Sequence, residues 1–223
     1  MTLAASRDGY GNGLMGLVHD EKVIVLEADL GKSTKSQMFR QAHPERTFSL
    51  GISEQNMMLV GAGLASCGYK PFASTFAIFT QRGFEQIRNG IARPNLPVHI
   101  CGSHGGIHTG SDGSSAQSIE DLAIYRSIPS MTVLHPCDDI SCEHLTLRLR
   151  THTECSYTRT VRNKTRRIYD ETSVEDLRIG EFSTLRSGPD VGIIACGVMV
   201  EEALDAADAL ADLGINATVV DAH

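Results

Sequence analysis

The hydrophobic positions of this chain form short continuous runs that alternate with stretches of helical spacing. Residues 23–26 are a continuous apolar run, which is typical of a strand buried on both faces of a parallel sheet. Residues 6–19 instead place apolar side chains such as Tyr10 and Leu14 one helical turn apart. We therefore expect an α/β fold in which a doubly wound, mainly parallel sheet occupies residues 1–165.

The same alternation predicts the other elements of this region. We expect further strands over residues 46–50, 71–74, 96–101, 131–134 and 155–159, and further helices over residues 36–41, 79–91, 118–126 and 138–152. Ser118 is the expected N-cap of the helix over residues 118–126, with Asp121 at the capping-box position. The residues that follow each strand should then meet at one edge of the sheet, where open α/β sheets bind their ligands.

The alternation of strand and helix breaks after Arg159. Residues 166–189 are polar and charged, and we expect a linker there with one or two short β segments. A second α/β unit follows over residues 190–223, with a strand, an amphipathic helix and another strand. Because one such unit cannot bury both faces of its sheet alone, we expect a partial domain that is either truncated or completed by something else.

Composition excludes several classes of protein. The net charge is −7, and no basic run suggests nucleic acid or an anionic membrane surface as a partner. No apolar stretch reaches the length of a membrane span, and the N-terminus has no signal-peptide pattern. The six cysteines form no CxxC pair, which argues against zinc and disulfides and for a cytoplasmic protein. We expect no metal to be held by this chain.

The stretch GISEQNMM at residues 51–58 contains the first candidate for chemistry. A β-rich run precedes it and a helical run of small residues follows it, so Glu54 lies where a strand passes into a helix. The free N–H groups and the dipole of a helix N-terminus stabilise a carboxylate at this position. Position alone fits a helix-starting acid equally well.

Several long blocks of this chain resemble the transketolase family. They are residues 51–65, 74–88, 101–106 and 120–123, in the order and at the separations found in that family. In the family, the glutamate that matches Glu54 activates thiamine diphosphate by sharing a proton with its pyrimidine ring. The resemblance implies that Glu54 and His104 are the catalytic residues.

The resemblance also implies which residues bind the cofactor. Phe76 and Phe79 match the aromatic residues that contact the pyrimidine ring, although core packing is the alternative for either. Asp29 and Leu30 match residues near the thiazolium ring. Together with Glu54, these four residues are the expected cofactor-binding set.

Five further residues match the family's substrate-binding positions. His104 and Asp112 lie in a long loop and match residues that hydrogen-bond sugar hydroxyls. Arg7, Ser33 and Arg162 match those that hold the sugar phosphate, a task suited to the forked donors of arginine.

Other positions leave alternatives open. Arg159 is a further candidate for the phosphate, and Arg162 fits a linker charge as well. The stretch SDGSSA at residues 111–116 departs from the family because Ala116 replaces a polar residue. Ser103 and His104 stand where deoxyxylulose-phosphate synthases, close relatives, carry Asp and Arg, which favours transketolase.

The family's diphosphate-binding motif, Gly-Asp-Gly followed by Asn, is absent from this chain. We therefore expect the C-terminal subunit of a split transketolase, which transfers a two-carbon ketol group between sugar phosphates. A diphosphate-binding partner subunit would hold Mg²⁺ or Ca²⁺, with a homodimer of this chain inside a heterotetramer. The alternatives are another thiamine diphosphate enzyme, such as a deoxyxylulose-phosphate synthase, and a non-catalytic paralogue.

Overall fold

Strand β2 (Val23–Glu27) is buried along its whole length, as its continuous apolar sequence predicts. In the computed structural model, which describes residues 2–223, it lies inside a six-stranded sheet with the order β3-β2-β4-β5-β7-β6. Every neighbouring pair of these strands is parallel. The α/β class with a parallel sheet is confirmed; the other strands are β3 (Thr47–Ser49), β4 (Lys70–Phe76), β5 (His99–Ser103), β6 (Thr132–Leu134) and β7 (Ser156–Arg159).

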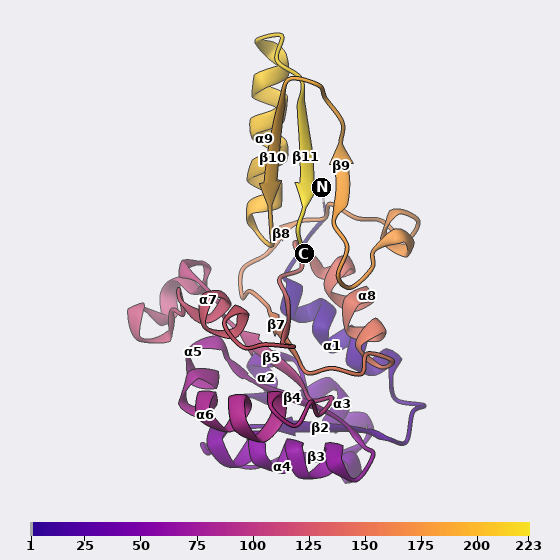
Figure 1. Ribbon diagram of the computed structural model, residues 1–223, viewed down its shortest axis with the longest axis vertical. Helices are drawn as coiled ribbons and strands as arrows, with labels where there is room; N and C mark the ends of the chain where they lie inside the picture. The colour runs from indigo at the N-terminus through magenta and orange to yellow at the C-terminus, as the bar shows by residue number, and fades with distance from the viewer. Residues whose placement is uncertain (1) are drawn as a thin grey trace.

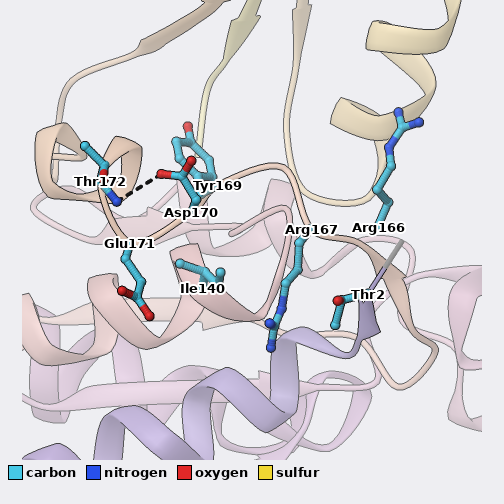
Figure 2. Close-up of a pocket in the computed structure, with 8 residues that line it drawn as sticks. All are labelled: Thr2, Ile140, Arg166, Arg167, Tyr169, Asp170, Glu171 and Thr172. Atoms are coloured by element: carbon cyan, nitrogen blue, oxygen red, sulfur yellow. Dashed lines mark hydrogen bonds between the residues drawn. The ribbon is translucent and has the colours of Figure 1, made fainter.

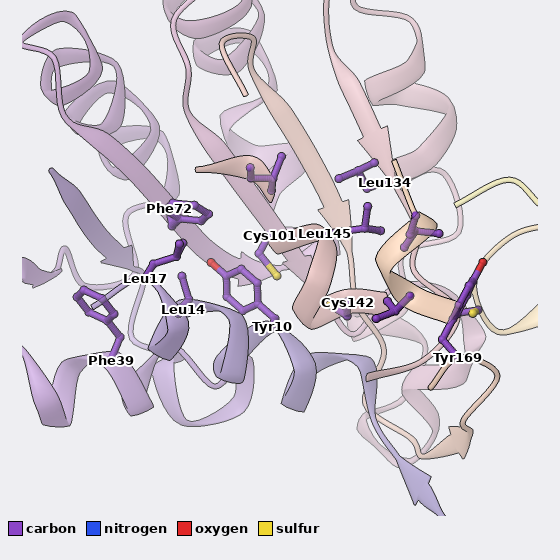
Figure 3. Close-up of a cluster of buried hydrophobic side chains, with 14 of the residues drawn as sticks. Tyr10, Leu14, Leu17, Phe39, Phe72, Cys101, Leu134, Cys142, Leu145 and Tyr169 are labelled. Carbon is purple, nitrogen blue, oxygen red and sulfur yellow. The ribbon is translucent and has the colours of Figure 1, made fainter. Parts of the chain in front are cut away.

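Alternate side chains of β2 enter two separate cores. Val23 and Val25 pack in one core with the helices α1 (Ser6–Gly16) and α8 (Asp139–Leu149), which Figure 3 shows in close-up. Ile24 and Leu26 pack in the other core with the long helix α4 (Glu54–Ser66). Because successive strand residues point to opposite faces, this division is the geometric signature of a sheet covered on both sides.

The remaining helices of the larger unit are short. They are α2 (Gly31–Thr34), α3 (Gln37–Ala42), α5 (Ala77–Thr80), α6 (Phe84–Gln86) and α7 (Asp121–Arg126). The expected single helix over residues 79–91 is instead α5, a 3-10 turn, α6 and a π-helical turn in succession. Gly83, in the 3-10 turn, packs so closely on α4 that an added Cβ would lie 3.1 Å from Met58. The irregular backbone over residues 77–92 thus occurs where this stretch packs closely on α4.

The starts of α8 and α7 show one helix cap that the local sequence determines and one that it does not. At α8, Asp138 forms a capping box with Ser141, and its Oδ1 accepts a 2.7 Å hydrogen bond from the Ser141 N–H. At α7, the expected cap by Ser118 is wrong, because this helix begins at Asp121. The Ser118 hydroxyl accepts a hydrogen bond from Gln81 instead, so a contact distant in sequence replaced the local cap.

A smaller unit extends away from the larger one, with α9 (Met199–Asp212) lying along its sheet (Figure 1). Its strands have the order β10-β11-β9, and β9 (Ser183–Arg186) comes from the stretch that we expected to be a linker. The other two are β10 (Val191–Ala195) and β11 (Ala217–Asp221). A short antiparallel pair, β1 (Leu3–Ala4) and β8 (Thr165–Arg166), lies near the junction of the units. No helix within residues 2–223 is long and apolar enough to span a membrane.

Candidate functional site

The candidate residues follow the carboxyl ends of five parallel strands. Since the strands are parallel, their carboxyl ends meet at one edge of the sheet, on either side of the point where strand order reverses between β2 and β4. After β2 come Asp29, Leu30 and Ser33; after β3, Glu54; at the end of β4 and beyond it, Phe76 and Phe79; after β5, His104 and Asp112; and after β7, Arg162.

Glu54 is the first residue of α4 and its side chain is only 3% exposed. The preceding residue, Ser53, makes no capping hydrogen bond with its side chain. The Glu54 Oε2 lies 3.5 Å from a guanidinium nitrogen of Arg82, whose own side chain is 60% exposed. Sequence reasoning missed Arg82, because an exposed arginine within a helical stretch carries no distinguishing signal.

Three stacked rings form an apolar wall at this edge. The ring centroids of Phe76 and Phe79 lie 5.6 Å apart, with the ring planes 7° from parallel. The imidazole of His104 stacks on Phe76, and the centroids of these two rings lie 3.9 Å apart. Parallel, offset rings of this kind are a favourable surface for a further flat aromatic group.

His104 is almost completely buried and sits in a left-handed backbone conformation, with φ at 61°. Its Nδ1 is 2.9 Å from the Ser103 hydroxyl, and its Nε2 is 3.4 Å from Arg7 and 3.8 Å from Asp112. Burial, and then the charge of Arg7, lower the pKa of His104 from 6.5 to about 4. The imidazole is therefore neutral at physiological pH, with one ring nitrogen able to donate and the other to accept.

Two guanidinium groups flank this imidazole. Arg7, near the start of α1, donates to the backbone carbonyl of Ser33 at 3.0 Å. Arg162 lies 3.8 Å from the Asp112 carboxylate and donates to the hydroxyl of Ser111. Burial, followed by the nearby charge of Arg162, lowers the pKa of Arg7. The Asp8 and Asp112 carboxylates oppose this shift. Two neighbouring guanidinium groups still provide a favourable place for a phosphate, because their forked donors match its oxygens.

Asp29 and Leu30 form the turn that presents Ser33. Asp29 has a left-handed backbone, with φ at 60°, and the Leu30 carbonyl accepts a 2.9 Å hydrogen bond from the Ser33 N–H. A non-glycine residue in this conformation costs on the order of 1–2 kcal/mol, and such strain often marks functional sites. Strained residues thus follow both β2 and β5 at this edge.

Arg159, the further candidate for the sugar phosphate, is held by other partners, and its role stays a prediction. Its guanidinium donates to the buried carboxylate of Asp121 at 2.9 Å and to the backbone carbonyl of Ser118 at 2.7 Å. Asp121 also accepts a 2.7 Å hydrogen bond from the hydroxyl of Tyr157.

Ala116, the position at which this chain departs from the family, is buried in the long loop.

A cavity of about 650 Å³ lies elsewhere, at the junction of the two units (Figure 2). Its two arginines are already paired: Arg167 holds Asp139 at 2.6 Å, and Arg166 holds Asp205 at 2.7 Å. The Asp170 carboxylate accepts a 2.9 Å hydrogen bond from the backbone of Thr172. These contacts join segments of the chain and leave little unsatisfied polarity for a ligand.

Within the described residues, no group of three or more His, Cys, Asp or Glu side chains is placed to hold a metal ion. The cluster at the sheet edge offers the nearly buried carboxylate of Glu54, the aromatic wall, the neutral imidazole of His104 and two guanidinium groups. That combination fits a ligand with one aromatic part and one anionic part.

Comparison with known proteins identifies the family. Residues 4–167 match the family described as "Transketolase, pyrimidine binding domain", and residues 180–223 match "Transketolase, C-terminal domain". A Methanocaldococcus jannaschii protein with the provisional name transketolase C-terminal section is 41% identical over 217 residues, covering 96% of this chain and 69% of the relative. Human transketolase is 38% identical over 223 residues, covering 97% of this chain and 35% of the relative. The chain thus spans about a third of that longer enzyme.

Solved structures agree. A split-gene transketolase, described as an inactive beta4 tetramer, aligns with a TM-score of 0.86 and 42% identity, covering 97% of this chain and 70% of that one. A Pichia stipitis transketolase in complex with xylulose 5-phosphate aligns with a TM-score of 0.88 and 25% identity, covering 99% of this chain and 35% of that one. On this evidence of sequence and structure, the chain belongs to the transketolase family.

Proposed function

We propose that this chain is the pyrimidine-binding, acid–base half of a transketolase that moves a two-carbon ketol group between sugar phosphates. The observation that carries the proposal is the convergence of Glu54, the stacked rings of Phe76 and Phe79, and the Arg7–Arg162 pair at one edge of the sheet. These residues fit the aromatic part of thiamine diphosphate and the anionic end of a sugar phosphate.

Thiamine diphosphate, when bound, supplies the thiazolium carbon that carries the ketol group. Glu54 holds a proton at N1′ of the pyrimidine ring, from a position at the strand end that is only 3% exposed to solvent. The stacked rings of Phe76 and Phe79 would pack against the pyrimidine face and exclude water from it. Asp29 and Leu30 lie in the turn after β2. They would line the cofactor site on the side of the thiazolium ring.

His104 is proposed to hydrogen-bond the hydroxyls of the sugar. Because its pKa is about 4, the neutral ring can donate through one nitrogen and accept through the other. Asp112 lies 3.8 Å from its Nε2 and orients the ring, while Arg7 and Arg162 bind the phosphate of the substrate.

A partner subunit is proposed to complete the site. The described residues offer no metal cluster, so the diphosphate and its Mg²⁺ or Ca²⁺ would be held by a diphosphate-binding subunit. The split-gene relative, whose structure is described as an inactive beta4 tetramer, supports this division of labour. We propose a heterotetramer that contains a homodimer of this chain.

The experiment is reconstitution with a diphosphate-binding transketolase subunit. Ketol transfer from a ketose phosphate to an aldose phosphate should appear only when both chains and the cofactor are present. The isolated chain should bind thiamine diphosphate weakly or not at all in a calorimetric titration with Mg²⁺. Tight, metal-dependent binding by this chain alone would contradict the two-subunit proposal.

A deoxyxylulose-phosphate synthase-like activity is the second candidate, because Ala116 offers a buried methyl group where the family commonly has a polar residue. A panel of ketose and 2-oxoacid donors with the reconstituted pair separates the two activities. An assembled, cofactor-loaded pair that transfers neither kind of group would instead indicate a non-catalytic paralogue.

A further inference from the structure

Glu27 ends β2 and is buried at the same edge of the sheet as the candidate functional site. Its side chain is only 1% exposed, and among the described residues Glu54 is the other buried glutamate. By strand alternation, the Glu27 side chain lies on the face of β2 that carries Val23 and Val25, where a hydrophobic side chain would pack at lower cost than a charged one. Packing of the core alone therefore does not explain a carboxyl group at this position.

The carboxylate of Glu27 accepts hydrogen bonds from two side chains that follow β2 in the sequence. The Ser36 hydroxyl donates to its Oε2 at 3.1 Å, and the Arg40 guanidinium donates to its Oε1 at 2.6 Å. Ser36 is completely buried, and its hydroxyl also lies 3.0 Å from that of Thr34. Gly31 packs so closely on the Glu27 carboxylate that an added Cβ would overlap it. The chain after β2 thus folds around this one side chain.

Residues 28–36, which we call the β2 segment, have a left-handed residue near each end. Asp29 has φ at 60°, and Lys35 has φ at 71°. Residues other than glycine hold such conformations only where the surrounding contacts fix them. The Glu27 carboxylate supplies such a contact from inside the segment, through its hydrogen bond with Ser36.

The β2 segment in turn holds Arg7. The Ser33 carbonyl accepts a 3.0 Å hydrogen bond from the Arg7 guanidinium, and the same nitrogen of Arg7 lies 3.4 Å from Nε2 of His104. A second contact, the 2.9 Å ion pair of Lys35 with Asp8, joins the segment to α1 beside Arg7. Because this pair is partly exposed, it contributes little by itself, and the position of Arg7 depends mainly on the Ser33 carbonyl.

We propose that Glu27 is a positioning residue, which fixes the β2 segment and thereby places the Arg7 guanidinium beside His104. The contacts run from the Glu27 carboxylate through Ser36 to the backbone of the segment, and from the Ser33 carbonyl to Arg7. The inference rests on the proposed function in one respect, which is that Arg7 binds the phosphate of the sugar. Glu27 acts through Arg7 and without contact to the substrate.

The first test uses the full chain without any partner. Glu27→Gln keeps the shape of the side chain but removes its charge and one of its two acceptor oxygens. We expect the amides of Ser33 and Thr34, which are hydrogen-bonded within the segment, to exchange with solvent deuterium about tenfold faster. The Nε resonance of the Arg7 side chain should shift as well. Amides of β4 should exchange at the unmutated rate, which would show that the chain remains folded.

Ser36→Ala removes only the donor that joins the segment to Glu27, and it should have the same effect. Added to Glu27→Gln, it should change little further, because both substitutions act on one hydrogen bond. Glu21→Gln, at an exposed acid just before β2, is the matched control and should leave the segment and Arg7 as they are. Should Glu27→Gln fail to fold, Ser36→Ala decides. Unchanged exchange and an unchanged Arg7 resonance in the folded variants would overturn the proposal, whatever the activity of the assembled enzyme.

The second test uses the chain reconstituted with a diphosphate-binding subunit. Glu27→Gln should raise KM for a phosphorylated ketose about tenfold, while kcat and the KM for an unphosphorylated sugar stay within about twofold. Equal losses with both sugars would reduce Glu27 to a residue that only supports the fold, and would overturn the proposal. If the unmutated pair transfers no ketol group, the proposed function fails, and the exchange rates and the Arg7 resonance of the chain alone still decide for or against Glu27.

Discussion

At one end of the candidate site, the Glu54 carboxylate lies 3.5 Å from Arg82, which is itself mostly exposed. At the other end, His104 is surrounded by Ser103, Arg7 and Asp112 within 3.8 Å. The first end has one weak charged partner, whereas the second is a connected network. A preorganised network needs little reordering when it binds a sugar, but a sparsely held carboxylate takes its final position from the group that it contacts.

This difference suggests that the chain builds the substrate end by itself and leaves the cofactor end for an assembled complex. Changes at the Glu54 end should then affect chemistry strongly and folding little. Changes at the His104 end should affect substrate affinity and also the stability of the chain. The following substitutions test that contrast.

The largest effect is expected for Glu54→Gln. Glutamine keeps the shape and a hydrogen-bonding end but cannot share an acidic proton with N1′ of the pyrimidine. In the reconstituted complex, exchange of the thiazolium C2 proton for deuterium should slow by about 10² to 10⁴, the usual contribution of a general acid–base group. The matched control is Glu21→Gln, at an exposed acid far along the chain. Exchange at the unmutated rate in Glu54→Gln would reduce Glu54 to a helix-starting acid.

A smaller loss is expected for Arg162→Ala. Loss of a charge-assisted hydrogen bond is worth about 1.5–3 kcal/mol, so kcat/KM for a phosphorylated sugar should fall about ten- to a hundredfold. The same variant should lose much less with an unphosphorylated sugar, because no phosphate contact is removed. Arg88→Ala, at an exposed arginine of the π-helical turn, is the control. Equal losses with both sugars would show that Arg162 only supports the loop through Ser111.

The sequence predicted the sheet well because its strands are buried on both faces. Continuous apolar runs such as residues 23–26 leave little doubt about a strand, and a parallel arrangement then places their carboxyl ends together. Local spacing was less informative at positions that are decided by distant contacts. Arg159 pairs with Asp121, and Ser118 accepts from Gln81, and neither partner is signalled by local spacing.

The site itself was predicted from the family resemblance more than from pattern. Spacing alone placed Glu54 at the end of a strand, but it did not distinguish a catalytic acid from a helix-starting one. The structure adds what spacing could not: the ring of His104 stacks on Phe76, and Arg82 faces Glu54. The roles of these residues stay predictions until the reconstituted enzyme is measured.

For His104→Ala we expect kcat/KM to fall about tenfold. The loss should be divided between a higher KM for the ketose and a lower kcat. Cofactor affinity in the assembled complex should stay nearly unchanged, since the imidazole is proposed to contact the sugar. His19→Ala serves again as the exposed control. A collapse of cofactor affinity would place His104 in the cofactor pocket and remove the contrast between the two ends.

The smallest effect concerns acid stability. The pKa of His104 is about 4 in the folded chain and about 6.5 when unfolded, so the unfolded chain binds more protons between these values. The free energy of unfolding therefore rises with pH across this window and is lost as the pH falls. Buried His99 and His135, with pKa values of about 3, add to the same trend.

His104→Ala should therefore flatten, without abolishing, the dependence of the melting temperature on pH between about 6.5 and 4. Phe79→Leu, which alters packing at the same edge but titrates nothing, should lower the melting temperature while leaving its pH dependence as steep as before. Thermal melts at closely spaced pH values measure both slopes. Equal slopes in His104→Ala and the unmutated chain would mean that the folded environment does not hold His104 neutral, and the preorganised network at this end would lose its main electrostatic support.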